Sequence, residues 1–240
     1  MHRADALDEM LNAVLKNPDF FLDNPASQFK SSRNVTVARI PRDGKTGWVL
    51  RRLNYGKPLH QLRDFFRPSR ARRAFWSGLR LEQAGVATAR VLAVCEVRRL
   101  GWPKRAYLLT EEIPRALTLS ELLKEKILSR TALLNLADVV ARLHDSGFSQ
   151  RDLKATNVLF DDQLRAHLID LDGVQYQGQV SQDRVVADLV CLARNFADLS
   201  QILKWRGGRF LQRYCQQRGQ VETWRYLNSR IAAVLQETRH

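Results

Sequence analysis

One short stretch in the second half of the chain constrains the fold more than any other feature. Residues 151–157 follow the pattern R-D-L-K-x-x-N, and Asp170 comes thirteen positions after Asn157. A strong helical pattern of apolar residues at 129–144 precedes this stretch. Two short strand patterns follow, around a turn at 161–163, and cover residues 157–160 and 166–170. The polar side chains therefore belong to a tight loop and to the end of a neighbouring strand.

This set of side chains suits phosphoryl transfer. The transition state spreads negative charge over phosphate oxygens, so catalysis consists mainly of positioning and charge neutralisation. Asp152 is placed to meet an attacking hydroxyl, and Lys154 could direct a positive charge at the same phosphate. Asn157 and Asp170 offer oxygen ligands of the kind that Mg²⁺ prefers beside phosphates. Taken singly, these residues also fit plain structural roles, as a turn cap, a strand start and an exposed strand end.

The first half of the chain has the pattern of a sheet that carries one main helix. Asp43-Gly44 is a turn signal between two β-rich runs, and Gly101-Trp102-Pro103 separates two more. A basic helix is expected to begin near Pro68-Ser69 and to stop at Gly85. A short N-terminal helix over 5–15 is expected to end at Asn17-Pro18. The predicted strands cover residues 34–40, 47–53, 89–97 and 105–113.

The second half changes character and is mostly helical. Thr118 and Glu121 form the sequence signature of a capping box at the start of a helix. From Asp183 onward the pattern is helical to the C-terminus. The composition shifts near residues 112–117, which predicts two lobes with the ranges 1–112 and 113–240.

Charge indicates the kind of partner. The chain has 39 Lys and Arg against 25 Asp and Glu, a net charge of +14, which favours an anionic partner. Nucleic acid is disfavoured because no helix-turn-helix, RNP or zinc signature accompanies the charge. A phosphate-rich lipid surface and an ordinary solvated helix face stay open as explanations. The densest basic stretch, opposed only by Asp64, contains Arg63, Arg67, Arg70, Arg72, Arg73 and Arg80.

Other sequence features indicate the cellular compartment of the protein. The sequence contains no run of about 18 uncharged apolar residues, so no membrane span is predicted. The N-terminal residues do not have the pattern of a secretory signal. The three cysteines are far apart and odd in number, which favours free thiols in a reducing compartment.

The loop pattern resembles the catalytic and metal-binding loops of the protein-kinase-like fold, H-R-D-L-x-x-x-N followed by D-F-G. A finer resemblance is to the bacterial lipopolysaccharide core kinases of the Kdo/WaaP family. It is carried by VLRRLN at 49–54, RPSRARRAFWSGLRLEQAGVATARVLA at 67–93, LLTEEI at 108–113, LHDSGFSQRDLKATNVLF at 143–160 and LIDLDGVQ at 168–175.

This resemblance implies an α+β, two-lobed protein-kinase-like fold. The N-lobe would be an antiparallel sheet with one main helix and would bind the nucleotide; the C-lobe would be mostly helical and carry the catalytic and metal loops. Such kinases use ATP and Mg²⁺ to phosphorylate a sugar hydroxyl, on Kdo or heptose, of the lipopolysaccharide core. The implied location is cytoplasmic and peripheral, at the inner face of the cytoplasmic membrane, with the anionic core or membrane surface as partner.

Within the resemblance, Arg51 occupies the position of the strand lysine that pairs with nucleotide phosphates. Glu111 to Ile113 would form the hinge that contacts adenine through backbone groups. The pattern departs at several positions: Ala74 stands where the basic helix should offer a glutamate, Gln150 replaces the loop histidine, and Asp172 replaces the glycine of D-F-G. Lys45 or Lys57 could compensate for the missing lysine. Asp172 fits either a second metal ligand or a turn residue.

Two other interpretations stay open. The departures at Arg51 and Ala74 fit a pseudokinase, a binding or regulatory module at the membrane that keeps the fold without turnover. A small-molecule kinase of the aminoglycoside or choline type would share the acidic residues. No A-P-E motif follows Asp172, so a peptide acceptor is disfavoured. His144, just before the loop, is expected to be a structural histidine.

Overall fold

The computed structural model describes residues 9–23, 28–32, 34–55, 68–100, 102–196 and 200–237. The chain divides into two compact units, residues 1–80 with 89–114, and residues 81–88 with 115–240. The functional division predicted at residue 112 stays a prediction. No helix in the described ranges combines the length and the apolar character needed to cross a bilayer.

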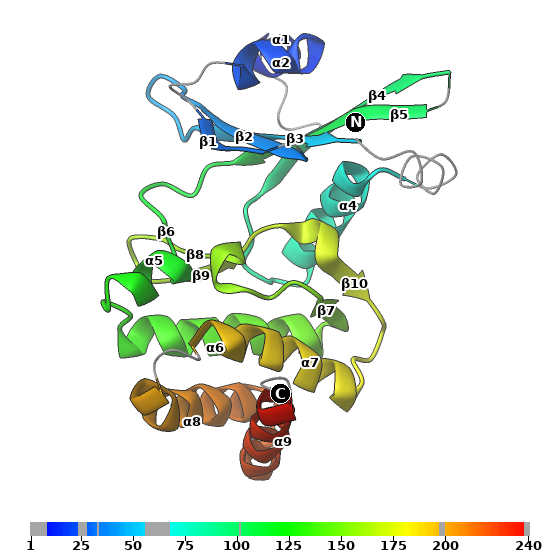
Figure 1. Cartoon of the computed structure of the whole chain (residues 1–240). Coiled ribbons are helices and arrows are strands. Elements are labelled where there is room, and N and C mark those ends of the chain that lie inside the picture. The colour runs from blue at the N-terminus through cyan, green and yellow to red at the C-terminus, as the bar shows by residue number, and fades with distance from the viewer. Residues whose placement is uncertain are drawn as a thin grey trace. The chain divides into compact units, whose positions relative to one another are not determined.

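The first unit is built on a five-stranded antiparallel sheet in the order β1-β2-β3-β5-β4 (Figure 1). This confirms the predicted antiparallel sheet with one main helix, α4, and adds β1 and a second N-terminal helix. Its elements are α1 (Glu9–Lys16), α2 (Pro18–Leu22), β1 (Gln28–Ser31), β2 (Val35–Ile40), β3 (Trp48–Asn54), α4 (Arg70–Gln83, which runs into the second unit), β4 (Val91–Arg99) and β5 (Trp102–Glu111).

Strand alternation gives the sheet two different faces. On one face Trp48, Leu50 and Tyr107 are buried with Leu11 and Leu22 of the N-terminal helices, so α1 and α2 cover this side. On the other face, Glu96 of β4 accepts a hydrogen bond from the amide of Ser69 at 3.1 Å, at the start of α4. Because successive side chains of a strand point to opposite faces, neighbouring residues of β3 serve different purposes.

Arg51 and Arg52 illustrate this division. Arg51 pairs in register with Val37 and Leu108 and lies on the face of α4. Arg52 lies on the opposite face, where its guanidinium contacts Asp19 at 2.8 Å. Of these two arginines, Arg51 is therefore the one on the face of α4, and its role toward nucleotide phosphates stays a prediction.

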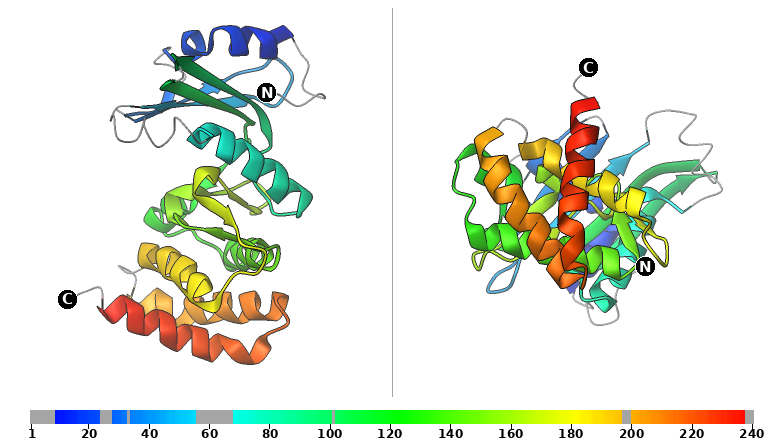
Figure 2. Two further views of the ribbon diagram at one scale, coloured as in Figure 1. Left: turned by 90° about the vertical axis from the view of Figure 1, so that its right-hand side faces the viewer. Right: turned by 90° about the horizontal axis from the view of Figure 1, so that it is seen from below.

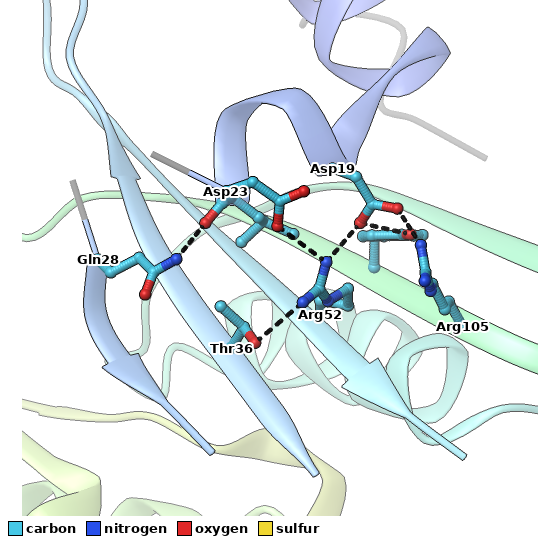
Figure 3. Close-up of polar contacts among 8 residues, drawn as sticks. Asp19, Asp23, Gln28, Thr36, Arg52 and Arg105 are labelled. Carbon is cyan, nitrogen blue, oxygen red and sulfur yellow. Dashed lines mark hydrogen bonds and ion pairs between the residues drawn. The ribbon is translucent and has the colours of Figure 1, made fainter. Parts of the chain in front are cut away.

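Asp19 of α2 fixes the N-terminal helices to the sheet (Figure 3). Its carboxylate accepts hydrogen bonds from Arg52, from Arg105 and from the Tyr107 hydroxyl, the last at 2.9 Å. Burial raises the pKa of Asp19, but the hydrogen bonds from Arg52 and Tyr107 and the charge of Arg105 lower it below its ordinary value. Burial and the bond to Asp19 raise the pKa of Tyr107 to about 12.

The second unit is mostly helical, as expected. Its elements after the lead-in at 81–88 are β6 (Leu117–Thr118), α5 (Leu119–Lys124), α6 (Arg130–Asp145), β7 (Phe148–Gln150), the 3₁₀ turn η3 (Ala155–Asn157), β8 (Val158–Phe160), β9 (Ala166–Leu168), η4 (Leu171–Gly173), β10 (Val174–Tyr176), α7 (Gln182–Ala193), η5 (Arg194–Phe196), α8 (Ser200–Gln217), η6 (Val221–Thr223) and α9 (Trp224–Glu237).

Helix α6 forms the centre of this unit. The apolar side of its amphipathic pattern, including Leu133, Leu136 and Val140, is buried. Helix α8 packs against α6 and α9 (Figure 2). Arg213 of α8 donates two hydrogen bonds, of 2.6 and 2.9 Å, to the carboxylate of Asp138 in α6. The predicted capping box at the start of α5 is confirmed: Thr118 and Glu121 exchange both bonds.

Two small sheets carry the loops of interest. One has the order β6-β8-β9, and the other pairs β10 with β7. The segment after α4 ties down β9, because the amide of Leu168 donates to the carbonyl of Ala87 at 3.0 Å and the Thr88 hydroxyl donates to the carbonyl of Leu168 at 2.8 Å. The end of β9, two residues before Asp170, is therefore held to residues 87–88 through both the amide and the carbonyl of Leu168.

Candidate active site

The loop after β7 positions Asp152 and Asn157 against each other. The Asn157 side-chain amide donates to the Asp152 carbonyl at 2.9 Å and to its carboxylate at 3.3 Å. Asn157 is buried, with only 8% of its surface exposed, so its orientation is fixed. Since its NH₂ group is used by Asp152, the Asn157 carbonyl oxygen is directed elsewhere and can serve as a ligand.

Lys154 belongs to the same cluster. Its ammonium lies 2.8 Å from the Asp152 carboxylate, and both side chains are about half exposed. The hydrogen bond to Asp152 raises the pKa of Lys154, and the negative charges of Asp152 and Asp170 add to this effect. The cluster therefore places a permanent cation beside two carboxylates.

Asp170 reaches the cluster through an unusual backbone conformation. It has φ 63° and ψ 58°, in the left-handed region that Asp and Asn tolerate better than most residues. The preceding amide, of Ile169, donates to the carbonyl of Asn157 at 2.9 Å, so the two predicted metal-ligand positions are joined through adjacent backbone. The structure brings together Asp152, Lys154, Asn157 and Asp170, as the sequence predicts.

Gln150 braces the two loops. Its side-chain NH₂ donates to the carbonyl of Asp170 at 3.1 Å, and its side-chain oxygen accepts from the amide of Asp152 at 3.4 Å. Gly173 leaves room for this brace, because a Cβ there would lie 2.4 Å from the Gln150 oxygen. Gln150, noted in the sequence only as a departure, thus links the backbone of Asp152 to that of Asp170.

Asp188 of α7 is a residue that the sequence reasoning missed. It is 1% exposed, and its carboxylate accepts from the Gln150 amide at 2.8 Å and pairs with Arg184. A buried acid on the apolar side of a helix is costly unless it is paired. Its position within the run VVADLV was the available signal.

His144 continues this buried network. Its Nδ1 contacts the Tyr214 hydroxyl at 2.7 Å, and its Nε2 lies 3.4 Å from Asp188. Burial lowers the pKa of His144, although the Asp188 carboxylate opposes this effect. His144 is thus a buried structural histidine, as expected.

Three predicted nucleotide-binding residues belong to the first unit. Arg51 lies in β3, Glu111 ends β5, and Ile113 follows it. The amides of Glu111 and Glu112 already donate within the unit, to the carbonyls of Arg90 and Gly47. Among the described residues, the Ile113 amide has no backbone hydrogen-bond acceptor, so it is the hinge donor to test.

Of the remaining positions named in the sequence analysis, three lie in described segments and three do not. Ala74 is buried in α4, with 2% of its surface exposed, so no carboxylate is offered there. Asp172 lies in η4, and both roles expected of it stay predictions. Lys45 lies within the connection between β2 and β3, where its amide donates to the carbonyl of Arg42. Lys57, Arg63 and Arg67 lie outside the described residues.

The donor set suits a hard divalent cation. Asn157 offers an amide oxygen and Asp170 offers a carboxylate. Mg²⁺ prefers a few such oxygen ligands and completes its shell with water and phosphate oxygens.

The sequence of the chain is similar to those of known proteins. The family model described as "Lipopolysaccharide kinase (Kdo/WaaP) family" matches residues 27–214. A 3-deoxy-D-manno-octulosonic acid kinase of Vibrio parahaemolyticus serotype O3:K6 is 34% identical over 99 residues, which cover 41% of each protein. The same-named kinase of Vibrio cholerae serotype O1 is 33% identical over 92 residues, which cover 38% of this chain and 39% of the relative. These matches span less than half of either relative.

Solved structures show the same fold. WaaP in complex with acyl carrier protein superposes with a TM-score of 0.65 at 20% identity, covering 96% of this chain and 97% of that one. The bifunctional kinase-methyltransferase WbdD superposes with a TM-score of 0.51 at 17% identity, covering 79% of this chain and 43% of that one. The expected two-lobed, protein-kinase-like fold is confirmed.

Proposed function

Because the chain belongs to the lipopolysaccharide kinase (Kdo/WaaP) family, we propose that it transfers the γ-phosphoryl group of ATP to a sugar hydroxyl, on Kdo or heptose, of the lipopolysaccharide core. The observation that carries the proposal is the cluster of Asp152, Lys154 and Asn157 on one loop, joined through backbone to Asp170. The curated relatives named as 3-deoxy-D-manno-octulosonic acid kinases support the class of acceptor.

In the proposed mechanism, Asp152 is the residue that contacts the acceptor hydroxyl. Its half-exposed carboxylate orients the sugar hydroxyl and accepts its proton late in the transfer. Lys154 holds a positive charge beside Asp152, where it neutralises the phosphoryl group in transfer. Asn157 orients Asp152 through two hydrogen bonds, which keeps the base in place before the acceptor arrives.

Asn157 and Asp170 would hold the Mg²⁺ ion, which neutralises the negative charge of the nucleotide phosphates when bound. Arg51 would contact the non-transferred phosphates, where a guanidinium can bind in a bidentate way. Glu111 and Ile113 would contact adenine through backbone groups, with the Ile113 amide as donor.

The proposed acceptor is anionic, and the basic charge of the chain supports this. The first turn of α4 contains Arg70, Arg72 and Arg73 and no acid. Cations at a helix N-terminus oppose the helix dipole, so helix stability does not explain them. They support docking to the lipopolysaccharide core or to the membrane surface that carries it, at the inner face of the cytoplasmic membrane.

A transfer assay tests the proposal. Purified protein is incubated with Mg²⁺, γ-labelled ATP and deacylated core oligosaccharide, with aminoglycosides and choline as competing acceptor classes. We expect label on the oligosaccharide, and a loss of about 100-fold or more for Asp170→Ala. The matched control is Asp162→Ala, an exposed acid on the β8–β9 turn that pairs with Arg115, which should stay within about twofold of wild type. No transfer by wild type, undiminished transfer by Asp170→Ala, or a preference for soluble amines would contradict the proposal.

The buried Ala74 favours one second candidate, a pseudokinase, because the usual acidic partner of the strand cation is missing there. A thermal-shift titration with Mg-ATP separates the two. A clear shift together with turnover rejects the pseudokinase, whereas a stable protein with neither shift nor turnover at millimolar nucleotide supports it.

A further inference from the structure

The β4–β5 hairpin ends in an apolar tip. The two strands stay paired up to Arg99 and Trp102. The sequence predicted that Gly101-Trp102-Pro103 would separate them, but Trp102 already belongs to β5. Figure 1 shows this hairpin projecting past the other strands of its sheet. At the tip, Leu100 is 91% exposed, Val97 is 43% exposed and Trp102 is 37% exposed.

Leucine is an unfavourable residue for the backbone conformation and the solvent exposure of position 100. Leu100 has a φ of 50°, in the left-handed region, where a tight hairpin connection favours Asn, Asp or Gly. A leucine there has both a strained backbone and an apolar side chain in water. Because residues held in strained conformations cluster at functional places, this combination points to a role outside the folded core.

The surroundings of the tip are basic. Arg98, Arg99, Lys104 and Arg105 are all exposed, and no acid occurs between Glu96 and Glu111 in the sequence. Arg98 pairs with Glu96 and Arg105 with Asp19, so Arg99 and Lys104 are the cations of the tip for which no such acidic partner is described. Arg99 stands directly opposite Trp102 in the register. An apolar tip with an aromatic residue and cations at its base is the composition of segments that lie in a membrane interface.

The start of α4 extends this basic surface. The contact between Glu96 and the Ser69 amide joins the base of the hairpin to the first turn of α4. That turn contains Arg70, Arg72 and Arg73. Anionic headgroups attract such clusters, whereas a few projecting apolar side chains do not form the flat patch or groove that a protein partner needs.

We propose that the tip of the β4–β5 hairpin inserts Leu100 and Trp102 into the interface of an anionic lipid bilayer, with the surrounding cations on the headgroups. This membrane contact is separate from phosphoryl transfer and needs neither nucleotide nor acceptor.

Vesicle sedimentation tests the inference. Vesicles of 1-palmitoyl-2-oleoyl phosphatidylcholine, alone or mixed with phosphatidylglycerol, are titrated with the full chain. We expect binding to the mixed vesicles, and a loss of roughly tenfold for Leu100→Asn, which removes the apolar group. Asn also suits a positive φ, so this variant should melt at or above the wild-type temperature. The control Ile127→Asn removes a 57% exposed apolar side chain from the second unit and should bind within about twofold of wild type.

The outcomes are distinct from those of the transfer assay. Leu100→Asn should phosphorylate soluble, deacylated oligosaccharide as wild type does. No binding of wild type to anionic vesicles, equal binding by Leu100→Asn, or equal loss by Ile127→Asn would overturn the hairpin anchor. So would loss of soluble transfer by Leu100→Asn, because the hairpin would then serve the enzyme's fold. If wild type transfers no label at all, the vesicle result still decides this inference.

Discussion

At the residue scale, Gln150 joins the two loops of the candidate site. Its side chain contacts the Asp170 carbonyl and the Asp152 amide, and its own amide is held by the buried Asp188. The loop pattern predicted the acids themselves, because their order and spacing follow from chemistry. It did not predict this brace, since hydrogen bonds from a buried amide depend on which loops pack together.

Gly173→Ala tests the brace. The new Cβ would lie 2.4 Å from the Gln150 side-chain oxygen, and Gln150 is 1% exposed, so the side chain must move and lose its contacts. We expect kcat to fall by roughly 10- to 100-fold, while the melting temperature falls by only a few degrees.

The matched control for this substitution is Gly208→Ala in α8, where nothing lies within 4 Å of the added Cβ. Alanine in a helix is more stable than glycine by about 0.5–1 kcal/mol, so this variant should melt slightly higher with unchanged kcat. Full activity of Gly173→Ala would show that Gln150 does not position the loops.

At the element scale, the N-terminal helices depend on one carboxylate. Helices α1 and α2 precede residue 27, where the family match begins. The sequence predicted the first helix and its end at Asn17-Pro18, because apolar spacing and proline act locally. It did not predict that the helices cover the sheet, since Asp19 reaches Arg105 and Tyr107, far along the chain.

Asp19→Asn tests this attachment and its pH dependence. The pKa of Asp19 is lower in the folded protein, so its stabilising effect is present above about pH 4 and is lost as pH falls through the folded value. We expect Asp19→Asn to reduce the free energy of unfolding by about 2 kcal/mol at pH 7. The difference from wild type should shrink as the pH falls below about 4, measured by urea unfolding at each pH.

Asp23→Asn is the control for Asp19. Its carboxylate contacts the same Arg52, but at 3.4 Å and with 67% of its side chain exposed, so the expected cost is under about 0.5 kcal/mol. Equal destabilisation by the two substitutions would contradict the central role of Asp19.

At the scale of the whole molecule, the proposed roles draw on both units. The second unit supplies the acids of the two loops, and the first supplies Arg51 and the hinge residues. The net charge of +14 indicated an anionic partner but no particular surface. That surface had to be found from exposure, because charge composition does not tell which residues project.

A crystal structure of the full chain with Mg²⁺ and a non-hydrolysable ATP analogue tests the central claim most directly. The account predicts an ion bound by the Asn157 side-chain oxygen and the Asp170 carboxylate, with Arg51 on the nucleotide phosphates and the Ile113 amide on adenine. A nucleotide bound without these residues, an ion held by other side chains, or no nucleotide at saturating concentration would contradict it.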